Sequence, residues 1–172
     1  IPKEKMTEQF LDQNPISRRR GITIKLAPVR MLYSSSVILN SFQDLDSDLR
    51  QNDNGKEYIL NLIDTPGHVD FSYEVSRTLA ACEGAILLVD ATQGIQAQTV
   101  AHYREAIKEK LTVIPVVNKI DLPSAEVDLV SKVLAETFGF KKEEIILISA
   151  KTGKNVDILL RKIIELLPSP RG

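Results

Sequence analysis

The sequence has few of the residues that characterise several large classes of protein. Aromatic residues make up 5% of the chain, and Cys82 is the only cysteine. So few aromatic residues argue against a stacking platform for single-stranded RNA, and one cysteine excludes an internal disulfide framework. The formal net charge of −1 gives no overall attraction to nucleic acid. Any contact with nucleic acid would need a local patch or another part of a longer protein.

Long apolar runs are also missing. No stretch approaches the roughly 18 residues of a membrane span, and no charged start followed by an apolar stretch marks a signal peptide. The 172 residues are 43% hydrophobic and 26% charged. This composition predicts one globular domain with a substantial core and no membrane span.

Short apolar runs alternate with segments of helical period from Tyr58 onward. This alternation predicts an α/β fold with a mostly parallel sheet and helices on both faces. Strands are predicted over residues 58–63, 85–89, 112–117 and 145–148. Helices are predicted over residues 71–81, 97–110, 126–138 and 156–167. Gly139 and Pro168 are typical of the positions where helices end.

The pattern differs before Tyr58. Residues 22–33 predict a further strand, and Pro28 favours the edge of a sheet because proline cannot donate to a ladder. Residues 34–56 are rich in Ser, Asp and Asn and predict a long loop or a hairpin insertion. We expect a domain over residues 1–167, with residues 168–172 starting a linker to another domain.

The stretch "DTPGHVDF" follows the predicted strand 58–63. Asp64 could hold a hydrated Mg²⁺, and the Gly67 backbone N–H could donate to a terminal phosphate. His68 could orient an attacking water and stabilise the transition state. The alternative interpretation is a turn and histidine that cap a helix.

The stretch "NKID" follows the predicted strand 112–117. Asp121 could accept from the ring N–H and the exocyclic amine of guanine, which adenine does not offer, so a mismatch would leave a carboxylate unpaired. The stem of Lys119 could lie over the purine, and Asn118 could tie loops together. By itself the motif is a coincidence or a surface turn in most proteins.

"SAK", comprising Ser149, Ala150 and Lys151, follows the predicted strand 145–148. A backbone N–H from Ala150 or Lys151 could meet the guanine carbonyl. The tripeptide alone carries little information. Because ligands of a parallel sheet bind at the carboxyl ends of its strands, the ordered motifs together predict one nucleotide site.

"RRRGITI" lies near the start of the chain. The Thr23 hydroxyl could coordinate Mg²⁺, and its backbone N–H could contact a γ-phosphate. The alternative is a basic turn leading into a strand. His102, in contrast, lies among charges on a predicted helix and is interpreted as part of a solvated face.

In order along the chain, "RGITI", "DTPGHVDF", "NKID" and "SAK" resemble the switch I, switch II and guanine-binding motifs of translational GTPases. The likeness runs from about Leu11 to the end, and within the family it is strongest to the elongation factor 4 (LepA) group. It implies a P-loop GTPase-type fold and a ribosome-dependent GTPase that converts GTP to GDP with Mg²⁺.

The resemblance also implies site residues. Thr23 would ligate Mg²⁺, and Asp64 would reach the ion through water. Gly67 would contact the γ-phosphate. His68 would position the attacking water, and Ile22 would form one wing of a hydrophobic gate beside that histidine. Guanine would be bound by Asn118, Lys119, Asp121, Ser149, Ala150 and Lys151. We expect a monomer that contacts the ribosome, including its RNA, in a bacterial cytoplasm, or on the mitochondrial matrix side if the source is organellar.

The chain departs from the family in three places. "SRRRG" has no acidic residue among its arginines, the 34–56 insertion is longer than the usual hairpin connection, and no G-x-x-x-x-G-K-S/T loop is present. We expect an interior fragment that lacks the central first strand, the phosphate loop and the first helix, and is by itself inactive. The rival interpretations are a pseudo-GTPase and an RNA-binding module that takes no nucleotide.

Overall fold

The structure is a computed structural model that describes residues 27–34, 56–65 and 72–169. The chain divides into two compact units, residues 1–64 and 65–172.

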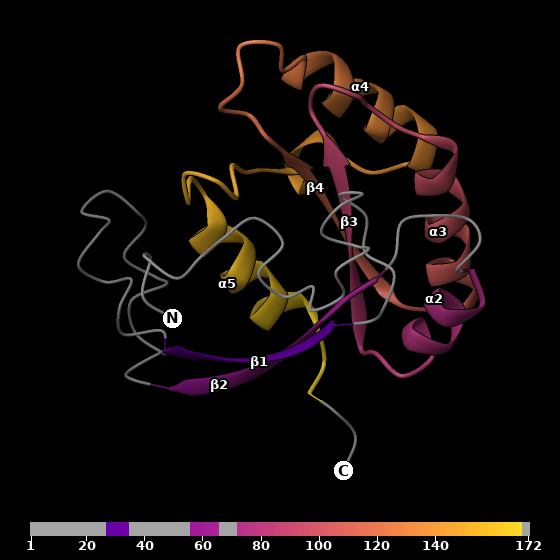
Figure 1. The fold of residues 1–172 in the computed structure, drawn as a ribbon, viewed down its shortest axis with the longest axis vertical. Helices are drawn as coiled ribbons and strands as arrows, with labels where there is room; N and C mark the ends of the chain where they lie inside the picture. The colour runs from indigo at the N-terminus through magenta and orange to yellow at the C-terminus, as the bar shows by residue number, and fades with distance from the viewer. Residues whose placement is uncertain (1–26, 35–55, 66–71, 170–172) are drawn as a thin grey trace, which may run out of the picture. The chain divides into compact units, whose positions relative to one another are not determined.

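The described part of the first unit is an antiparallel hairpin (Figure 1). Strand β1 spans Ala27–Ser34 and strand β2 spans Glu57–Asp64, with Ala27 opposite Asp64 and Ser34 opposite Glu57. Pro28 pairs in register with Ile63, and the Arg30 Nε donates to Asn61 Oδ1 at 3.3 Å across the ladder. The predicted strand at 58–63 is therefore present, and its described partner runs antiparallel to it. The 34–56 insertion lies largely outside the described residues.

The second unit contains a parallel sheet in the order β3-β4-β5. Strand β3 spans Gly84–Asp90, β4 spans Thr112–Asn118 and β5 spans Ile146–Leu147. The helices are α2 (Ser72–Leu79), α3 (Ala97–Lys108), α4 (Val127–Phe138) and α5 (Val156–Leu166), with a short 3₁₀ turn, η5, at Lys142–Glu144. The predicted α/β alternation is confirmed, with boundaries shifted by one or two residues.

The residues of β4 divide the core between the two faces of the sheet. Val117 packs with Val130 and Leu134 of α4 on one face. Ile114 and Val116 pack with Leu159 of α5 on the other. Figure 1 shows the same arrangement, with α3 and α4 on one side of β3 and β4 and α5 on the opposite side. Side chains of a strand alternate between faces, so a buried run such as this one needs cover on both.

Two glycines have specific structural roles. Gly139 follows α4 with φ +77°, the left-handed conformation predicted for a glycine at a helix end. Gly84 begins β3 where a Cβ would collide with the Leu167 side chain and approach the Thr112 carbonyl oxygen to 3.0 Å. The absence of a side chain at Gly84 therefore lets the residue after α5 pack against the start of the sheet.

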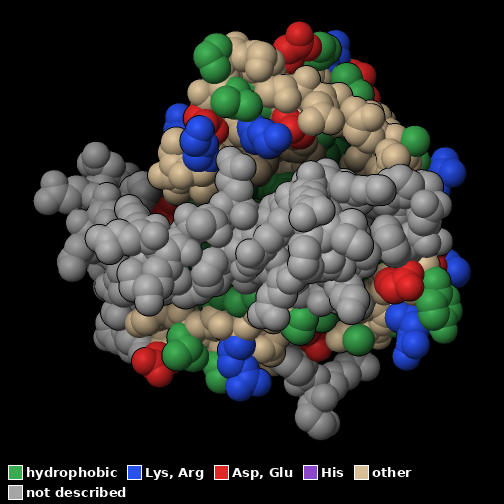
Figure 2. Space-filling view, viewed as in Figure 1, with side chains coloured by type: hydrophobic (Ala, Val, Ile, Leu, Met, Phe, Trp, Pro, Cys, Tyr) green, Lys and Arg blue, Asp and Glu red, His purple; other side chains and the backbone are tan. Residues whose placement is uncertain are grey.

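Charges of both signs are mixed on the surface. On the face shown in Figure 2, lysine and arginine side chains of the described residues lie among aspartates and glutamates. None of the helices in the described part of the chain has the length and apolarity needed to cross a bilayer.

Leu134 tests whether α4 is anchored through this core. Its side chain is 0% exposed, whereas Leu129 on the same helix is 55% exposed. We expect Leu134→Ala to lower the free energy of unfolding by about 2–5 kcal/mol and Leu129→Ala to lower it by less than about 1 kcal/mol. Urea unfolding followed by circular dichroism measures both, since the chain has no tryptophan. Equal effects of the two variants would contradict the burial of Leu134.

Candidate functional site

Three loops meet at one rim of the second unit, because β3, β4 and β5 are parallel and end at the same edge of the sheet. The first loop follows Asp90, the second starts at Asn118, and the third starts at Ser149. These are the carboxyl ends of strands, where ligands of open α/β sheets bind. The last two loops carry the predicted "NKID" and "SAK" motifs.

Asn118 connects all three loops. Its backbone carbonyl accepts from Ala91 N–H at 2.9 Å. Its side-chain Oδ1 accepts from Lys119 N–H at 2.7 Å and from Ala150 N–H at 3.0 Å. Asn118, at the end of the central strand, therefore accepts from three backbone N–H groups, one from each loop, and links the three loops together.

Ser149 is fully buried and organises the third loop. Its Oγ accepts from Thr152 N–H at 3.1 Å, and its N–H and carbonyl bond to Lys154 and Gly153. Asn155 closes the turn in a left-handed conformation, and its Nδ2 donates to the Leu147 carbonyl at 2.8 Å. The hydroxyl of Ser149 is held in place by this turn.

Asp121 presents an exposed carboxylate beside Ser149. The hydrogen bond from the Ser149 hydroxyl, together with the charge of Lys151, lowers the pKa of Asp121 below its usual value. The carboxylate is therefore ionised at neutral pH, and its exposure leaves it open to a ligand with two adjacent N–H donors. This is the chemistry that predicts a base selector.

Lys119 lies between Asn118 and Asp121 with φ +66°. Its ammonium group forms an ion pair with Asp90, Nζ to Oδ2 at 2.6 Å, while about half of its side chain is exposed. The structure thus brings together six of the predicted site residues on one rim: Asn118, Lys119, Asp121, Ser149, Ala150 and Lys151.

Sequence reasoning missed Asp90. Its Oδ1 accepts from Thr92 N–H at 2.8 Å and from the Thr92 hydroxyl at 2.7 Å. Burial alone would raise the pKa of Asp90, but the hydrogen bonds from Lys119 and Thr92 lower it below its usual value. The signal that could have found it is its place directly after a predicted strand, at the same edge as the motifs.

The remaining predicted residues belong to other parts of the chain. Ile22, Thr23, Gly67 and His68 lie outside the described residues. Asp64 is the last residue of β2 in the first unit. The described residues contain no group of three or more His, Cys, Asp or Glu side chains that could hold a metal. A single carboxylate such as Asp64 suits Mg²⁺, which keeps most of its waters and binds few protein ligands.

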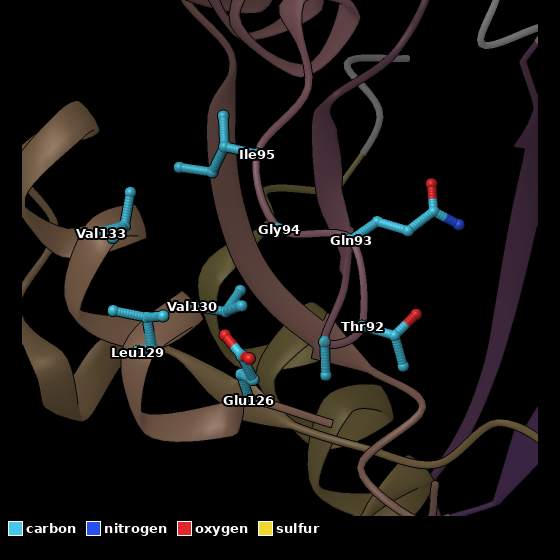
Figure 3. A pocket seen from close by; sticks show the side chains of 9 residues that line it. Thr92, Gln93, Gly94, Ile95, Glu126, Leu129, Val130 and Val133 are labelled. Carbon is cyan, nitrogen blue, oxygen red and sulfur yellow. The ribbon is translucent and has the colours of Figure 1, made fainter. Parts of the chain in front are cut away.

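A small pocket lies between the loop after β3 and α4 (Figure 3). Its volume is about 210 Å³, and Ile95, Leu129, Val130 and Val133 give it an apolar wall. Ligand pockets are usually about 300–1,000 Å³. None of the six residues of the rim lines this pocket, so it is separate from the candidate site.

The hydroxyl of Ser149 provides a direct test of the rim. We expect Ser149→Ala to raise the pKa of Asp121, because the mutation removes the largest influence that lowers it. A lowered folded-state pKa stabilises the fold above the unfolded-state pKa and loses this effect as the pH falls through the folded-state value, so the variant should also lose less stability on acidification.

Carboxyl ¹³C NMR titration measures this pKa. Thr152→Ala is the matched control, since the Thr152 hydroxyl accepts only from Lys154 N–H among the bonds described. The control should leave the pKa of Asp121 unchanged. An unchanged pKa in Ser149→Ala would show that the two side chains are not coupled.

Relatives of similar sequence align with this chain over its whole length. Elongation factor 4 of Aquifex aeolicus (strain VF5) is 49% identical over all 172 residues, which are 26% of that protein. Elongation factor 4 of Limosilactobacillus fermentum (strain NBRC 3956 / LMG 18251) is 51% identical over the same span, 25% of its length. The chain therefore spans about a quarter of the length of these relatives.

The fold of this chain is similar to parts of solved elongation factor structures. A bacterial selenocysteine-specific elongation factor EF-Sec matches with a TM-score of 0.68 and 25% identity over 91% of this chain and 24% of its own. SelB from Methanococcus maripaludis, solved with the GTP analogue GppNHp, matches with a TM-score of 0.60 and 28% identity over 68% of this chain and 28% of its own. A model of the elongation factor Tu GTP-binding domain matches residues 1–169. The chain therefore belongs to the elongation factor Tu GTP-binding domain family.

Proposed function

We propose that the protein carrying this chain is a ribosome-dependent translation elongation GTPase of the elongation factor 4 type, and that this chain supplies its guanine-binding part. The observation that supports the proposal most is the gathering of Asn118, Asp121 and Ser149 on one rim, with the carboxylate of Asp121 ionised and exposed. The relatives of similar sequence are named for translation elongation.

Base recognition follows from the chemistry of the rim. Asp121 accepts from the two adjacent N–H groups on one edge of guanine, and the stem of Lys119 covers one face of the ring. A backbone N–H of Ala150 or Lys151 donates to the guanine carbonyl. Adenine lacks the matching donors and would leave the carboxylate of Asp121 unpaired, which is costly in a desolvated complex.

The phosphate side of the reaction depends on residues before the second unit's sheet. Thr23 and Asp64 would hold Mg²⁺, which neutralises charge on the β- and γ-phosphates. Gly67 N–H donates to the γ-phosphate, and His68 orients the attacking water while Ile22 shields it. The nucleophile is water, so hydrolysis breaks the bond between the β–γ bridging oxygen and the γ-phosphorus and yields GDP and phosphate.

The cellular setting is part of the same proposal. The protein acts as a monomer on the ribosome, in contact with ribosomal RNA through the full-length chain. Its location is the bacterial cytoplasm, or the mitochondrial matrix side for an organellar source.

Nucleotide preference tests the assignment of Asp121. We expect the full-length protein to bind GDP at least about 10³-fold more tightly than ADP, since a site built to pair with specific donors rejects an analogue lacking them. Asp121→Asn should reverse the preference from GDP to XDP, whose base carries a carbonyl in place of the exocyclic amine. Fluorescence competition with a labelled nucleotide measures all three affinities.

Asp128→Asn, in the first turn of α4, is the matched control because it makes the same chemical change away from the rim. It should leave the preference for GDP unchanged. Equal affinity of the parent protein for GDP and ADP would refute the proposed function.

The role of His68 is tested by hydrolysis. We expect His68→Ala to slow ribosome-stimulated GTP hydrolysis by at least about 100-fold, because positioned groups that act on the attacking water typically contribute that much or more. The affinity for GTP should change by less than about threefold. Release of phosphate under single-turnover conditions and equilibrium binding measure the two quantities.

The second histidine provides the control. His102→Ala, on α3, should leave the hydrolysis rate at the parent value. A collapse of GTP affinity in His68→Ala would argue that this histidine binds the nucleotide rather than acting on water.

A further inference from the structure

The side chain of Lys119 is fixed at both of its ends. At the backbone end, Lys119 N–H donates to Asn118 Oδ1 at 2.7 Å, and the residue has φ +66°. At the other end, Nζ lies 2.6 Å from Asp90 Oδ2. The aliphatic stem between these two points is therefore restricted before any ligand binds.

Asp90 is itself held by its own loop. Thr92 donates to Oδ1 through its N–H and its hydroxyl, at 2.8 and 2.7 Å. Gln93 Nε2 donates to Oδ2 at 3.3 Å. Ala91 N–H bonds to the Asn118 carbonyl and joins this loop to the one that contains Lys119. The carboxylate thus offers a fixed anchor, and its side chain is only 18% exposed.

The ion pair is poorly explained as a device for stability alone. Half of the Lys119 side chain is exposed, and partly exposed ion pairs contribute little to the free energy of unfolding. The left-handed backbone of Lys119 carries a further conformational cost for a residue that is not glycine. An arrangement that costs energy locally and returns little stability is typical of a preorganised binding surface.

We propose that Asp90 is a positioning residue for guanine binding, which anchors the ammonium group of Lys119 so that the aliphatic stem forms a preformed surface for one face of the purine ring. This inference rests on the proposed function of the rim. Lys119 and Asp121 share one turn, closed by Leu122 N–H to the Lys119 carbonyl at 3.1 Å. This turn fixes the position of the Lys119 stem, which would contact the ring face, relative to the Asp121 carboxylate, which would contact the ring edge.

The first experiment compares two purine nucleotides in the full-length protein. Asp90→Asn keeps the shape of the side chain and removes its charge. We expect it to weaken GDP binding about three- to tenfold, the effect of releasing one long side chain that must be ordered again on binding. The affinity for IDP, which lacks the exocyclic amine, should fall by the same factor, because the Lys119 stem contacts the face of the ring and not the amine. Asp121→Asn, in contrast, should change the ratio of GDP to IDP affinity.

A double-mutant cycle separates positioning from a general structural effect. Lys119→Met keeps an unbranched apolar stem and removes the ammonium group. In that background we expect Asp90→Asn to change GDP affinity by less than twofold, because its partner is already absent. A loss as large as in the parent protein would overturn the inference. If Asp90→Asn fails to fold, Asp90→Ser, which still accepts from Thr92 N–H, replaces it in the cycle.

Glu105→Gln is the matched control. Glu105 also accepts from a hydroxyl, that of Ser76, and from a lysine, Lys108, but it lies on α3. It should leave GDP affinity within twofold of the parent value. Parent protein that does not prefer GDP to ADP would refute the proposed function, whereas parent preference with unchanged binding by Asp90→Asn would refute this inference alone.

Discussion

The amide oxygen of Asn118 is the interaction on which the rim depends. Parallel strands bring several loops to one edge, and each loop brings backbone N–H groups that need an acceptor. Asn118 accepts from the second and third loops with its side chain and from the first with its carbonyl. Leaving such donors unpaired costs more than the bonds contribute when made. The central strand therefore specifies the arrangement of loops that come from three separate parts of the sequence.

Two pairs of side chains are built on this arrangement, and they use charge in different ways. Asp121 takes a hydrogen bond from a buried hydroxyl and keeps its carboxylate exposed for a ligand. Asp90 is mostly covered and directs its carboxylate to Lys119. One acid is thus available to an incoming molecule, while the other acts within the protein. Hydrogen bonds lower the pKa of both carboxyls below the usual value for aspartate.

Much of the second unit follows from patterns that the sequence displays directly. Apolar runs of strand length separated by helical periods predict β3, β4 and the helices, and a parallel sheet then predicts that "NKID" and "SAK" meet. The ends of elements are harder to predict. Ile145 and Ile148 are buried like strand residues, yet the β5 ladder spans only Ile146–Leu147. Hydrophobicity reports burial and does not fix where a strand ends, since Ile148 N–H still donates to the Val117 carbonyl of β4 at 2.8 Å beyond the last residue of β5.

Contacts between residues far apart in the sequence are also hard to predict. The apolar run in β2 predicts a strand, but nothing in its pattern says that the described partner is β1 running antiparallel. A single aspartate after a strand is common, and the significance of Asp90 depends on Lys119, a residue of another loop. Asn155 likewise has a left-handed backbone and a bond to Leu147 that its type permits but does not predict.

Helix α5 is attached to the sheet at both of its own ends. At its start, Asn155 bonds to the Leu147 carbonyl where the third loop begins, and just beyond its end Leu167 occupies the space left by Gly84 at the opposite edge. Close-packed protein interiors have low compressibility and transmit strain. A side chain at residue 84 is therefore expected to displace Leu167 and the end of α5, the helix whose first turn adjoins the loop that holds Ser149.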